Sequence, residues 1–557
     1  MGGPVGPQIL GWQGYVRVDD ITYSFLGDFP DNQIVTNISR TIITPTRTTW
    51  TMPAGPMEIN VTFFSPIEPG DPIRQSIPFS YLYFEAVSTN GAEHSVQVYS
   101  DISAEWSSGN RSEVVQWSTV AGSNSIFHQV FLSEQTTFKE IDQQAEWGTL
   151  YYSTKVNSLV TYKVASDQSC RDEFHDKGKL DFGEDTQFRG IASSFPVYAI
   201  ATDLGAITST QDSPVVWAIG YTRDPASKYS DASSLINDFL DDFPNAKNRA
   251  DQLDAKILTA ANNVSSDYAD LVSLAARQVF GATELTISKG ADGNWSTSDV
   301  MMFMKNIGES SRNRVNAVEV LYQSFPLFMY VDPTLGGPLL EPLLRFQNST
   351  NYTNPYAAQD IGSSYPVALA SNHTHNEGVE QSANMLIMAY AHARATGDGS
   401  LAFRYYNLFS RWTDFLIGGS LHPTDQASSD TGDATNLTNL AIKGIIAIKA
   451  MSELSMALGR VNDAQQYSAN ATQLVQQWTS QALSSDKSRL LETYGDASSM
   501  TLGYNLFADR WLGTQLVDQS VYNAQTGFFA QISSGNTFGL PTDSSDPGHA
   551  SSSQSVH

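Results

Sequence analysis

The chain has 557 residues, of which 41% are hydrophobic and 16% are charged, and its formal net charge is -26. This length exceeds what one hydrophobic core normally serves, so we expect two or three domains. The apolar share is that of a folded protein and excludes the disordered class. The acidic balance, without any run rich in Lys or Arg, argues against binding to nucleic-acid phosphates.

The cysteine count and the sequence of the first residues bear on the compartment. Cys170 is the single cysteine, so no disulfide can form within the chain. No apolar run is long enough for a transmembrane helix, which argues against a membrane protein. The opening MGGPVGPQILGW has neither the basic nor the apolar region of a signal peptide. A secreted protein would therefore carry its signal peptide upstream of this sequence.

The motif Asn-x-Ser/Thr, which accepts N-linked glycans, favours secretion to the extracellular space or cell wall. Its frequency predicts that N-linked glycans are attached to the chain. The ten candidate asparagines are Asn37, Asn60, Asn110, Asn263, Asn294, Asn348, Asn351, Asn372, Asn436 and Asn470.

Residues 1–225 are predicted to form an antiparallel β-sandwich domain. GYVRVDDITYSFLG suggests two short strands around Asp19 and Asp20. In SYLYFEAVSTNGAEHSVQVYSDI, aromatic and β-branched residues flank Asn90-Gly91, which predicts a hairpin with a type I′ turn. Further strands are predicted at FHQVF, TLYYSTKV, SLVTYKVA, PVYAIATDL and PVVWAIGYT. Many strands without intervening helices indicate a sandwich.

The apolar spacing changes to that of helices after the sandwich. Residues 226–290 are predicted to form a helical linker and the first helix of a toroid, and residues 291–540 form the rest of that toroid. The segment from Leu440 to Leu458 is apolar around most of its circumference and predicts a buried helix. The following segment, Asp463 to Leu483, is amphipathic and predicts a covering helix.

The predicted buried helices begin near Asn313, Glu380, Asn439 and Leu502, roughly 60 residues apart, which is the period of a helical-hairpin repeat. Stacked hairpins can close into a ring, and the loops that enter its inner helices then share one face. Polar side chains in those loops are therefore expected to lie together. Residues 541–557 are rich in Ser, Asp and Gly and predict a disordered tail.

Several segments resemble the fungal glutaminase A family. They include GWQGYVRVDDITYSFLGD, VQVYSDISAEWSSG, NEGVEQSANMLIMAYAHARATGD and YGDASSMTLGYNLFADRWLG, and the resemblance covers nearly the whole chain in order. It implies a secreted fungal protein of α+β multidomain class, with an N-terminal β-sandwich followed by an (α/α)6-type helical toroid. The implied activity is hydrolysis of L-glutamine to L-glutamate and ammonia. Family members extend beyond this sequence at both ends, so we expect a truncated chain and leave the closure of the toroid open.

Carboxylates in the loops before the predicted inner helices are the candidate acids and bases. Amide hydrolysis needs activated water, a proton shuttle and a stabilised oxyanion, and no G-x-S-x-G motif supplies a serine nucleophile. Cys170, in the β region, is interpreted as incidental. Paired carboxylates can act as acid and base on one bond. The candidate catalytic residues are Glu380, Asp430, Asp496, Asp360 and, as a proton shuttle, His375.

Each of these acids also has a plain structural interpretation. Asp433 and Asp496 precede helices, where a carboxylate caps N–H groups and meets the positive end of the helix dipole. His373 and His375 form an H-x-H, but no further ligand stands at a zinc-like spacing, so we expect neither a metal nor another cofactor. The resemblance places an amide where Glu377 stands, so Glu380 is the stronger candidate for a catalytic carboxylate in that loop.

Six residues near these loops are candidates for binding the substrate. Trp295 and Tyr356 could stack on a sugar or pack in the core, and Asn439 and Lys443 could bind an α-carboxylate or satisfy a buried helix. The complete set is Tyr356, Asn376, Glu377, Asn439, Lys443 and Trp295.

Three functions of different classes follow from these observations. The leading one is a glutaminase-like amidohydrolase acting on a small-molecule substrate, which the resemblance alone supports. The first alternative is a carbohydrate-active hydrolase that uses two of Glu380, Asp430 and Asp496. The second alternative is a non-catalytic secreted binding protein.

Overall fold

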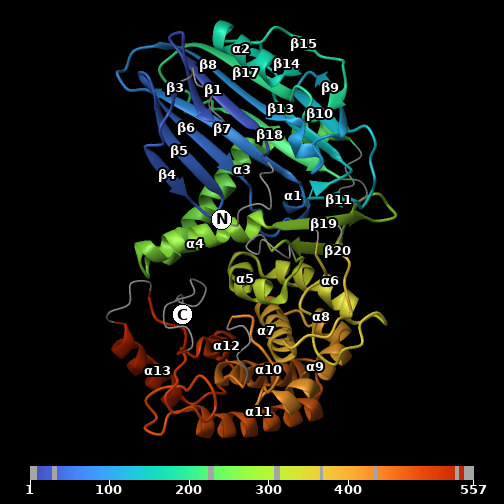
Figure 1. Cartoon of the computed structure of the whole chain (residues 1–557), viewed down its shortest axis with the longest axis vertical. Helices are drawn as coiled ribbons and strands as arrows, with labels where there is room; N and C mark the ends of the chain where they lie inside the picture. The colour runs from blue at the N-terminus through green and yellow to red at the C-terminus, as the bar shows by residue number, and fades with distance from the viewer. Residues whose placement is uncertain are drawn as a thin grey trace. The chain divides into compact units, whose positions relative to one another are not determined.

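The computed structural model describes residues 9–27, 34–142, 144–223, 231–306, 314–363, 368–430, 436–533 and 539–544. These residues fall into two compact units (Figure 1). The first runs to Val300, and the second comprises Met301–Asn306, Arg314–Ser363 and the described residues from Ala368 onward. The predicted fold class is confirmed, because an antiparallel β-sandwich precedes a domain of helical hairpins.

Two sheets form the first unit. The smaller has the strand order β15-β14-β17-β8-β1-β2-β3, and the larger has the order β16-β9-β10-β13-β18-β7-β6-β5-β4. The strands of the smaller sheet are β1 (Trp12–Val18), β2 (Ile21–Leu26), β3 (Ile34–Val35), β8 (His94–Ser103), β14 (Val160–Ser166), β15 (Gly183–Glu184) and β17 (Pro196–Ile207). Those of the larger sheet are β4 (Arg40–Ile43), β5 (Arg47–Ala54), β6 (Met57–Phe64), β7 (Phe79–Ser88), β9 (Val114–Ala121), β10 (Ser125–Leu132), β13 (Thr149–Lys155), β16 (Arg189–Gly190) and β18 (Val215–Thr222).

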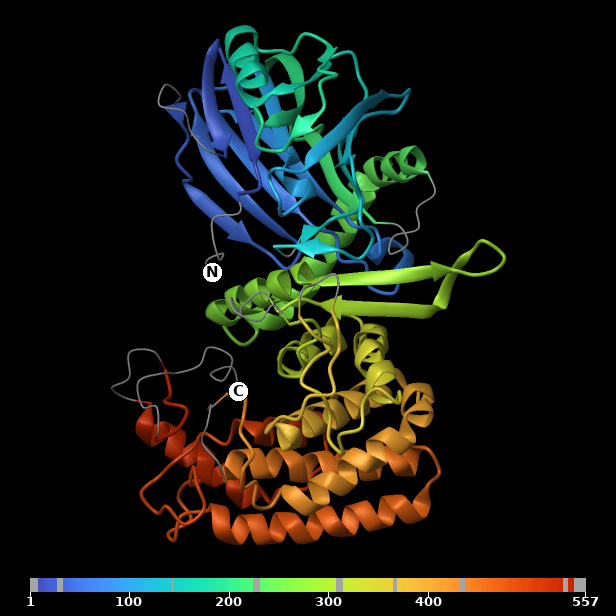
Figure 2. The same ribbon diagram turned by 45° about the vertical axis from the view of Figure 1, so that its right-hand side comes forward.

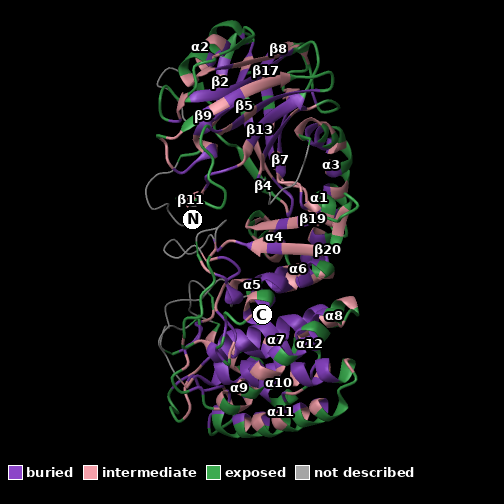
Figure 3. Ribbon diagram, turned by 90° about the vertical axis from the view of Figure 1, so that its right-hand side faces the viewer, coloured by how far each residue is buried: buried purple, intermediate pink, exposed green. Residues whose placement is uncertain are grey.

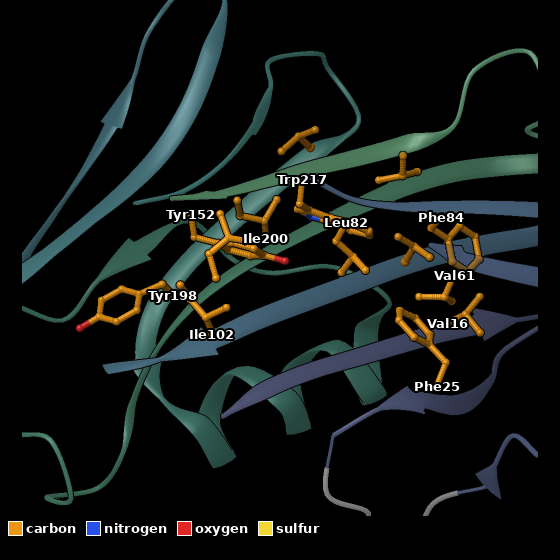
Figure 4. Packing of buried hydrophobic residues seen from close by; sticks show 14 of the residues in the cluster. Val16, Phe25, Val61, Leu82, Phe84, Ile102, Tyr152, Tyr198, Ile200 and Trp217 are labelled. Carbon is orange, nitrogen blue, oxygen red and sulfur yellow. The ribbon is translucent and has the colours of Figure 1, made fainter. Parts of the chain in front are cut away.

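The core of the sandwich lies between the two sheets. Val16 and Ile200 of the smaller sheet meet Val61, Leu82 and Trp217 of the larger one, and all five are fully buried (Figure 4). Alternate residues along each strand point inward, as the period of two in the sequence requires. Each buried aliphatic side chain contributes about 1.5–3 kcal/mol, so this layer dominates the stability of the unit.

The two predicted tight turns have different outcomes. Asp19 and Asp20 join β1 to β2, which pair antiparallel, and both have the positive φ of a type I′ turn, at 47° and 67°. The hairpin predicted around Asn90-Gly91 is wrong. Strand β7 pairs with β6 and β18 in the larger sheet, whereas β8 pairs with β1 and β17 in the smaller one. The segment therefore crosses between the sheets, because the inward face of each strand finds its partners in a different layer.

The elements between residues 231 and 304 also differ from the prediction. Helix α3 (Ala232–Asn262) covers the outer face of the larger sheet, where the rings of Phe239 and Tyr81 stack at 4.1 Å (Figure 1). Helix α4 (Ser266–Gly281), predicted as the first helix of the toroid, belongs to the first unit. A hairpin follows it (Figure 2), formed by β19 (Thr283–Lys289) and β20 (Trp295–Met304), where the sequence analysis had assigned helical linker and toroid.

Shorter elements complete the first unit. They are α1 (Pro72–Gln75), η1 (Ala104–Ser107), β11 (Glu140–Ile141), β12 (Gln144–Ala145) and α2 (Asp167–Lys177).

The second unit is helical. Its elements are α5 (Val318–Val331), η2 (Pro333–Leu335), α6 (Gly336–Gln347), α7 (Gly378–Thr396), α8 (Ser400–Arg404), α9 (Tyr406–Gly419), α10 (Thr438–Ala457), α11 (Val461–Ala482), η3 (Tyr504–Leu506), α12 (Phe507–Leu512) and α13 (Gln519–Ile532). Among the residues that the structure describes, no helix has the length and apolar character needed to cross a membrane.

The predicted hairpin period is confirmed in this unit. Helices α5, α7 and α10 begin at Val318, Gly378 and Thr438, at intervals of 60 residues. Helices α7 and α10 are buried along most of their length, and α7 packs between α5 and α10 (Figure 3). Helix α11 is amphipathic and covers α10, as predicted. The fourth inner helix, expected near Leu502, is represented by the short η3 and α12.

The predicted disordered tail begins too early in the sequence. Thr542 and Asp543 are buried, and the backbone N–H of Leu502 donates to the carbonyl of Thr542 at 2.9 Å. These two residues therefore extend the packed part of the helical unit. The remainder of the tail, from residue 545, lies outside the described residues.

Candidate active site

The loops that enter the inner helices of the second unit bring the candidate residues together. Helix α7 begins at Gly378, where a Cβ atom would lie 2.8 Å from Tyr356 and 2.9 Å from Phe415. Only glycine fits between these rings, and its backbone therefore packs directly beneath them. The side chain of Gln426 accepts a hydrogen bond from the Val379 N–H at 3.0 Å and so ties the loop before α10 to the start of α7.

A buried ion pair between Glu380 of α7 and Lys443 of α10 lies at the centre of the site. The two residues are 1% and 2% exposed, and Lys443 Nζ donates to Glu380 Oε1. Asn384 Nδ2 donates to the same oxygen at 3.3 Å. Lys443 Nζ also lies 4.4 Å from the centre of the Tyr322 ring, in a cation–π contact. This pair joins two inner helices, and both of its side chains are buried.

Burial dominates the electrostatics of the pair. It raises the pKa of Glu380, an effect that Lys443 opposes and that the nearby carboxylate of Asp430 adds to. For Lys443, burial alone would lower the pKa, but Glu380, Tyr322 and Asp430 together raise it above the ordinary value. The ammonium group therefore stays charged at neutral pH, while Glu380 accepts a proton more readily than an exposed glutamate would.

Asp430 provides an exposed carboxylate beside this pair. Tyr504, in η3, donates its hydroxyl to Asp430 Oδ2 at 2.8 Å. The backbone N–H of Asp430 donates to Ser428 Oγ at 3.3 Å, and Ser428 Oγ donates to Glu380 Oε2 at 3.4 Å. Ser428 thus connects the exposed acid to the buried one.

The conformation of Tyr504 depends on the glycine before it. Gly503 has a φ of 63°, a left-handed value that glycine adopts without strain, and it turns the chain into η3. Burial raises the pKa of Tyr504 well above its ordinary value, and Asp430 and Glu380 add to this effect. Its hydroxyl therefore stays protonated and acts as a donor toward Asp430.

A second polar network is centred on the next residue of α7, Gln381. Gln381 Nε2 donates to Glu377 Oε2 at 2.7 Å and to Glu319 Oε2 at 3.2 Å. Arg314 pairs with Glu319 and lies 3.6 Å from Asp360 Oδ2. The predicted residues Glu377 and Asp360 are therefore brought to the site, but both already serve a network that fixes α5 against α7.

His375 is held by the backbone through both ring nitrogens. Its Nε2–H donates to the carbonyl of Ala357 at 3.0 Å, and its Nδ1 accepts from the Glu377 N–H at 3.2 Å. Its ring packs edge-on against Tyr356 at 4.8 Å, and burial lowers its pKa. This geometry favours a role in shaping the loop over the predicted role as proton shuttle, because both nitrogens are occupied.

The structure places the remaining predicted residues as follows. Asp496 lies in an exposed turn, where it accepts from the backbone N–H and the hydroxyl of Ser498. The carboxylate therefore caps a turn, rather than the start of a helix as the structural interpretation assumed. Trp295 lies in the first unit at the start of β20, with Lys289 Nζ 4.9 Å from its ring centre. Asp433 lies outside the described residues.

Two polar residues of the predicted binding set differ in burial. Asn439 is buried, and its Oδ1 accepts from the Asn505 N–H at 3.1 Å. Asn376 has an exposed side chain, and its carbonyl accepts from the Ala427 N–H at 2.8 Å. Asn439 therefore joins α10 to η3, whereas Asn376 borders the loop before α10.

The sequence analysis missed several residues of the site. Tyr504 precedes the fourth inner helix. The expectation that polar side chains in the loops entering the inner helices lie together should have included it. A cavity of about 10 Å³, the size of one water molecule, lies beside Tyr504 and Asn439. Its lining includes Glu492 and Asp543, two buried carboxylates that we did not predict. Asp543 fell within the segment predicted as disordered, so no pattern in the sequence pointed to it.

In the part of the chain that the structure describes, no group of three or more His, Cys, Asp or Glu side chains could hold a metal ion. The ten sequons differ in accessibility. Six asparagines are exposed, whereas Asn60, Asn110, Asn436 and Asn470 are partly buried.

Comparison with known proteins identifies related sequences along the whole chain. Residues 265–554 match the family described as the glutaminase A six helical-hairpin domain, and residues 46–260 match a domain family of unknown function. Glutaminase A from Aspergillus oryzae is 35% identical over 563 residues, covering 96% of this chain and 79% of that protein. A protein named as a probable glutaminase, from Arthroderma benhamiae, is 27% identical, covering 88% of this chain and 68% of its own length.

Among solved structures, a bacterial glucoamylase complexed with acarbose aligns with a TM-score of 0.46 and 12% identity, covering 94% of this chain and 73% of that one. At this TM-score the likeness does not establish a shared fold. The matches to the family model and to the Aspergillus protein are decisive, and the chain belongs to the glutaminase A family.

Proposed function

We propose that the chain is a glutaminase-like amidohydrolase that converts L-glutamine and water to L-glutamate and ammonia. The relatives named as glutaminases support the reaction class. The observation that carries the proposal is the exposed Asp430, whose backbone N–H donates to Ser428 Oγ, while the Ser428 hydroxyl in turn donates to the buried Glu380 of the Glu380–Lys443 pair. The two carboxylates lie in different surroundings, which is the arrangement that separates an acid from a base.

Asp430 would act as the general base. Tyr504 engages its Oδ2, and its Oδ1 has no hydrogen-bond partner among the described residues. That oxygen could therefore accept a proton from water as the water oxygen adds to the carboxamide carbon. The C–N bond then breaks, the nitrogen takes up a proton, and ammonia leaves.

Glu380 would supply that proton. Burial raises its pKa, so it holds a proton more readily than an exposed carboxylate. Ser428 Oγ lies 3.4 Å from Glu380 Oε2 and provides a hydroxyl through which the proton could pass toward the leaving group. Lys443 keeps the charge of the pair balanced when Glu380 is ionised.

The test is ammonia release from L-glutamine by the purified chain and three variants. We expect Asp430→Asn and Glu380→Gln to lower kcat at least about 100-fold, the usual contribution of acid–base catalysis. Asp496→Asn is the matched control, because it changes an exposed carboxylate that accepts hydrogen bonds within its own turn. We expect that variant to retain the activity of the parent.

A panel of glycosides assayed in parallel tests the two alternatives. Paired carboxylates can also hydrolyse a glycosidic bond, so sugar release without ammonia would assign the chain to carbohydrate hydrolysis. Full activity in Asp430→Asn would remove that residue from the mechanism. If neither substrate reacted, the amidohydrolase proposal would fail and a binding role would be favoured.

A further inference from the structure

The outer face of the larger sheet in the first unit has an aromatic half and a polar half. Helix α3 covers the aromatic half, where Phe64, Tyr81 and Tyr83 pack against Phe239 and Phe243. On strands β4 to β7, beyond the reach of this packing, polar side chains line a hollow of about 480 Å³. We call it the polar hollow. Strands β5 to β7 of this hollow lie within the segment matched by the domain family of unknown function, and β4 precedes that segment.

The strand register arranges the polar side chains of the hollow in rows. Glu85, Asn60, Thr51 and Arg40 are successive cross-strand partners on β7, β6, β5 and β4. Neighbouring strands lie about 4.8 Å apart, so the row runs roughly 14 Å from the backbone of β7 to that of β4. A parallel row contains Thr62 and Thr49, whose hydroxyls share a hydrogen bond of 2.9 Å.

Several groups of the row are available to a ligand. Thr51 Oγ1 donates to Asn60 Oδ1 at 2.7 Å, which directs the amide but leaves its Nδ2 without a partner among the described residues. Within the same described set, neither the Glu85 carboxylate nor the Arg40 guanidinium has a hydrogen-bond or ion-pair partner. Burial raises the pKa of Glu85, against the opposing effect of Lys247 and Arg47, so this carboxylate is partly desolvated without being paired.

We propose that the polar hollow binds a short neutral oligosaccharide. Hydroxyl, amide, carboxylate and guanidinium groups on one floor match the alternating donors and acceptors of sugar hydroxyls. The lining contains two arginines, Arg40 and Arg47, and two glutamates, Glu58 and Glu85, and the chain carries a net charge of -26, so a polyanion is disfavoured. The row is longer than a single free amino acid, whereas a chain of several sugars matches its length of roughly 14 Å.

The carbohydrate has two possible sources. A free oligosaccharide could enter from solution, or an N-linked glycan on the sequon Asn60-Val61-Thr62 could occupy the hollow within the same molecule. Both would present the same hydroxyl chemistry to Glu85 and Arg40.

The first experiment uses the full chain from a host that adds no N-linked glycans. Binding of laminarihexaose, chitohexaose and mannohexaose is measured by isothermal titration calorimetry. We expect one or more to bind, and we expect Glu85→Gln and Arg40→Gln each to weaken that binding about tenfold, as loss of a charged hydrogen bond would. Glu93→Gln, an exposed carboxylate outside the hollow, is the control and should bind as the parent does.

Two results would overturn the proposal. One is the absence of binding to all three hexasaccharides, and the other is binding that both hollow variants leave unchanged. Glutaminase assays on the same variants keep this result separate from the proposed function, because neither residue belongs to the candidate active site.

The second experiment distinguishes the two sources. The chain is produced in a glycosylating yeast, and the peptide containing Asn60 is analysed by mass spectrometry. A glycan at Asn60 together with loss of hexasaccharide binding would assign the hollow to the glycan of the chain itself. An unmodified Asn60 with binding retained would assign it to free carbohydrate. A glycan at Asn60 with undiminished binding would place the binding elsewhere and overturn the proposal.

Discussion

Each unit contains an ion pair with a fully buried carboxylate, and the two carboxylates differ in how completely their oxygens are hydrogen-bonded. In the sandwich, Asp101 accepts two hydrogen bonds from Arg171, at 2.9 and 3.0 Å, and one from the Tyr99 hydroxyl at 2.6 Å. In the helical unit, Glu380 Oε1 accepts from Lys443 and Asn384, but the contact of Oε2 with Ser428 is long, at 3.4 Å. Both oxygens of Asp101 therefore have short hydrogen bonds. Glu380 has one weakly bonded oxygen, on the side of the exposed Asp430.

This difference separates a structural pair from a candidate catalytic one. A carboxylate that is bonded at every position gains little from protonation, whereas one with a weakly bonded oxygen can take up or release a proton. Burial by itself therefore does not identify function. The direction in which the unsatisfied oxygen faces is more informative, and in the helical unit it faces the loop that enters α10.

The largest expected effect is on stability. At a pH where Glu380 is ionised, Lys443→Met leaves its carboxylate buried without a partner, and we expect the helical unit to lose about 3–5 kcal/mol of unfolding free energy. Hydrogen exchange of the α10 amides measures this loss for that unit alone. Adding Glu380→Met to Lys443→Met should recover most of it. A single variant as stable as the parent would show that Glu380 is already protonated in the native state.

The second effect concerns pH and acts on the sandwich. His128 is fully buried, and desolvation lowers its pKa to about 4 from an ordinary value of 6.5. The unfolded chain therefore binds a proton first as the pH falls. Stability contributed by neutral His128 is fully present above pH 6.5 and is lost between about pH 6.5 and 4, by about 3 kcal/mol in all.

Urea unfolding of the sandwich across this pH range checks the prediction, and His128→Asn is expected to flatten the dependence. Glu380 acts in the opposite sense in the helical unit. Its pKa is raised above 4.5, so the unfolded chain ionises first and stability falls as the pH rises through the folded value. Parallel pH dependence in both units would contradict the assigned environments.

A smaller effect concerns Tyr504. The Tyr504→Phe substitution removes the hydroxyl that donates to Asp430 at 2.8 Å but keeps the ring. Loss of a hydrogen bond to a charged group should lower kcat for L-glutamine about tenfold, with KM little changed. Steady-state kinetics provide the measurement. An unchanged kcat would mean that Asp430 needs no orienting donor, and Tyr522→Phe, which removes a donor to Asp509, serves as the control.

The smallest effect calibrates the comparison. Lys155 and Asp241 form an ion pair of 2.8 Å on the surface of the sandwich, with side chains 50% and 61% exposed. Solvent screens such a pair, so Lys155→Met should change the unfolding free energy by less than about 1 kcal/mol. A loss of unfolding free energy as large as that of Lys443→Met would mean that the ion pair itself, rather than its burial, determines the size of the loss.

Local patterns in the sequence predicted most of the elements. The period of two located β10, β13, β14, β17 and β18, and the apolar spacing located α7, α10 and α11 within a few residues. The wrong predictions concern which strands pair with each other, rather than where the strands and helices lie in the sequence. Asn90-Gly91 permits a reversal, but the choice between one sheet and two depends on which faces are buried together, and a single sequence does not specify this.

The candidate site shows the same difference between residues that could be predicted and contacts that could not. Glu380 and Lys443 were predicted as separate candidates for acid and substrate binding, yet they are 63 residues apart in sequence and bond to each other. Asp496 had the same sequence context as the others, but a local turn with Ser498 engages it. Its exposure depends on how the chain packs after α11, which the loop composition does not reveal.

The regular spacing of the inner helices has a consequence for how the chain folds. Helices α5, α7 and α10 contact partners one hairpin away, so the ends brought together are separated by about 60 residues or fewer. In the sandwich, Ile102 of β8 must find Tyr198 of β17, nearly 100 residues later. Longer loops cost more entropy before their contacts form, so the sandwich is the slower unit to fold. It is also the first to leave the ribosome, and its edge strands therefore stay exposed to other chains during the synthesis of the helical unit.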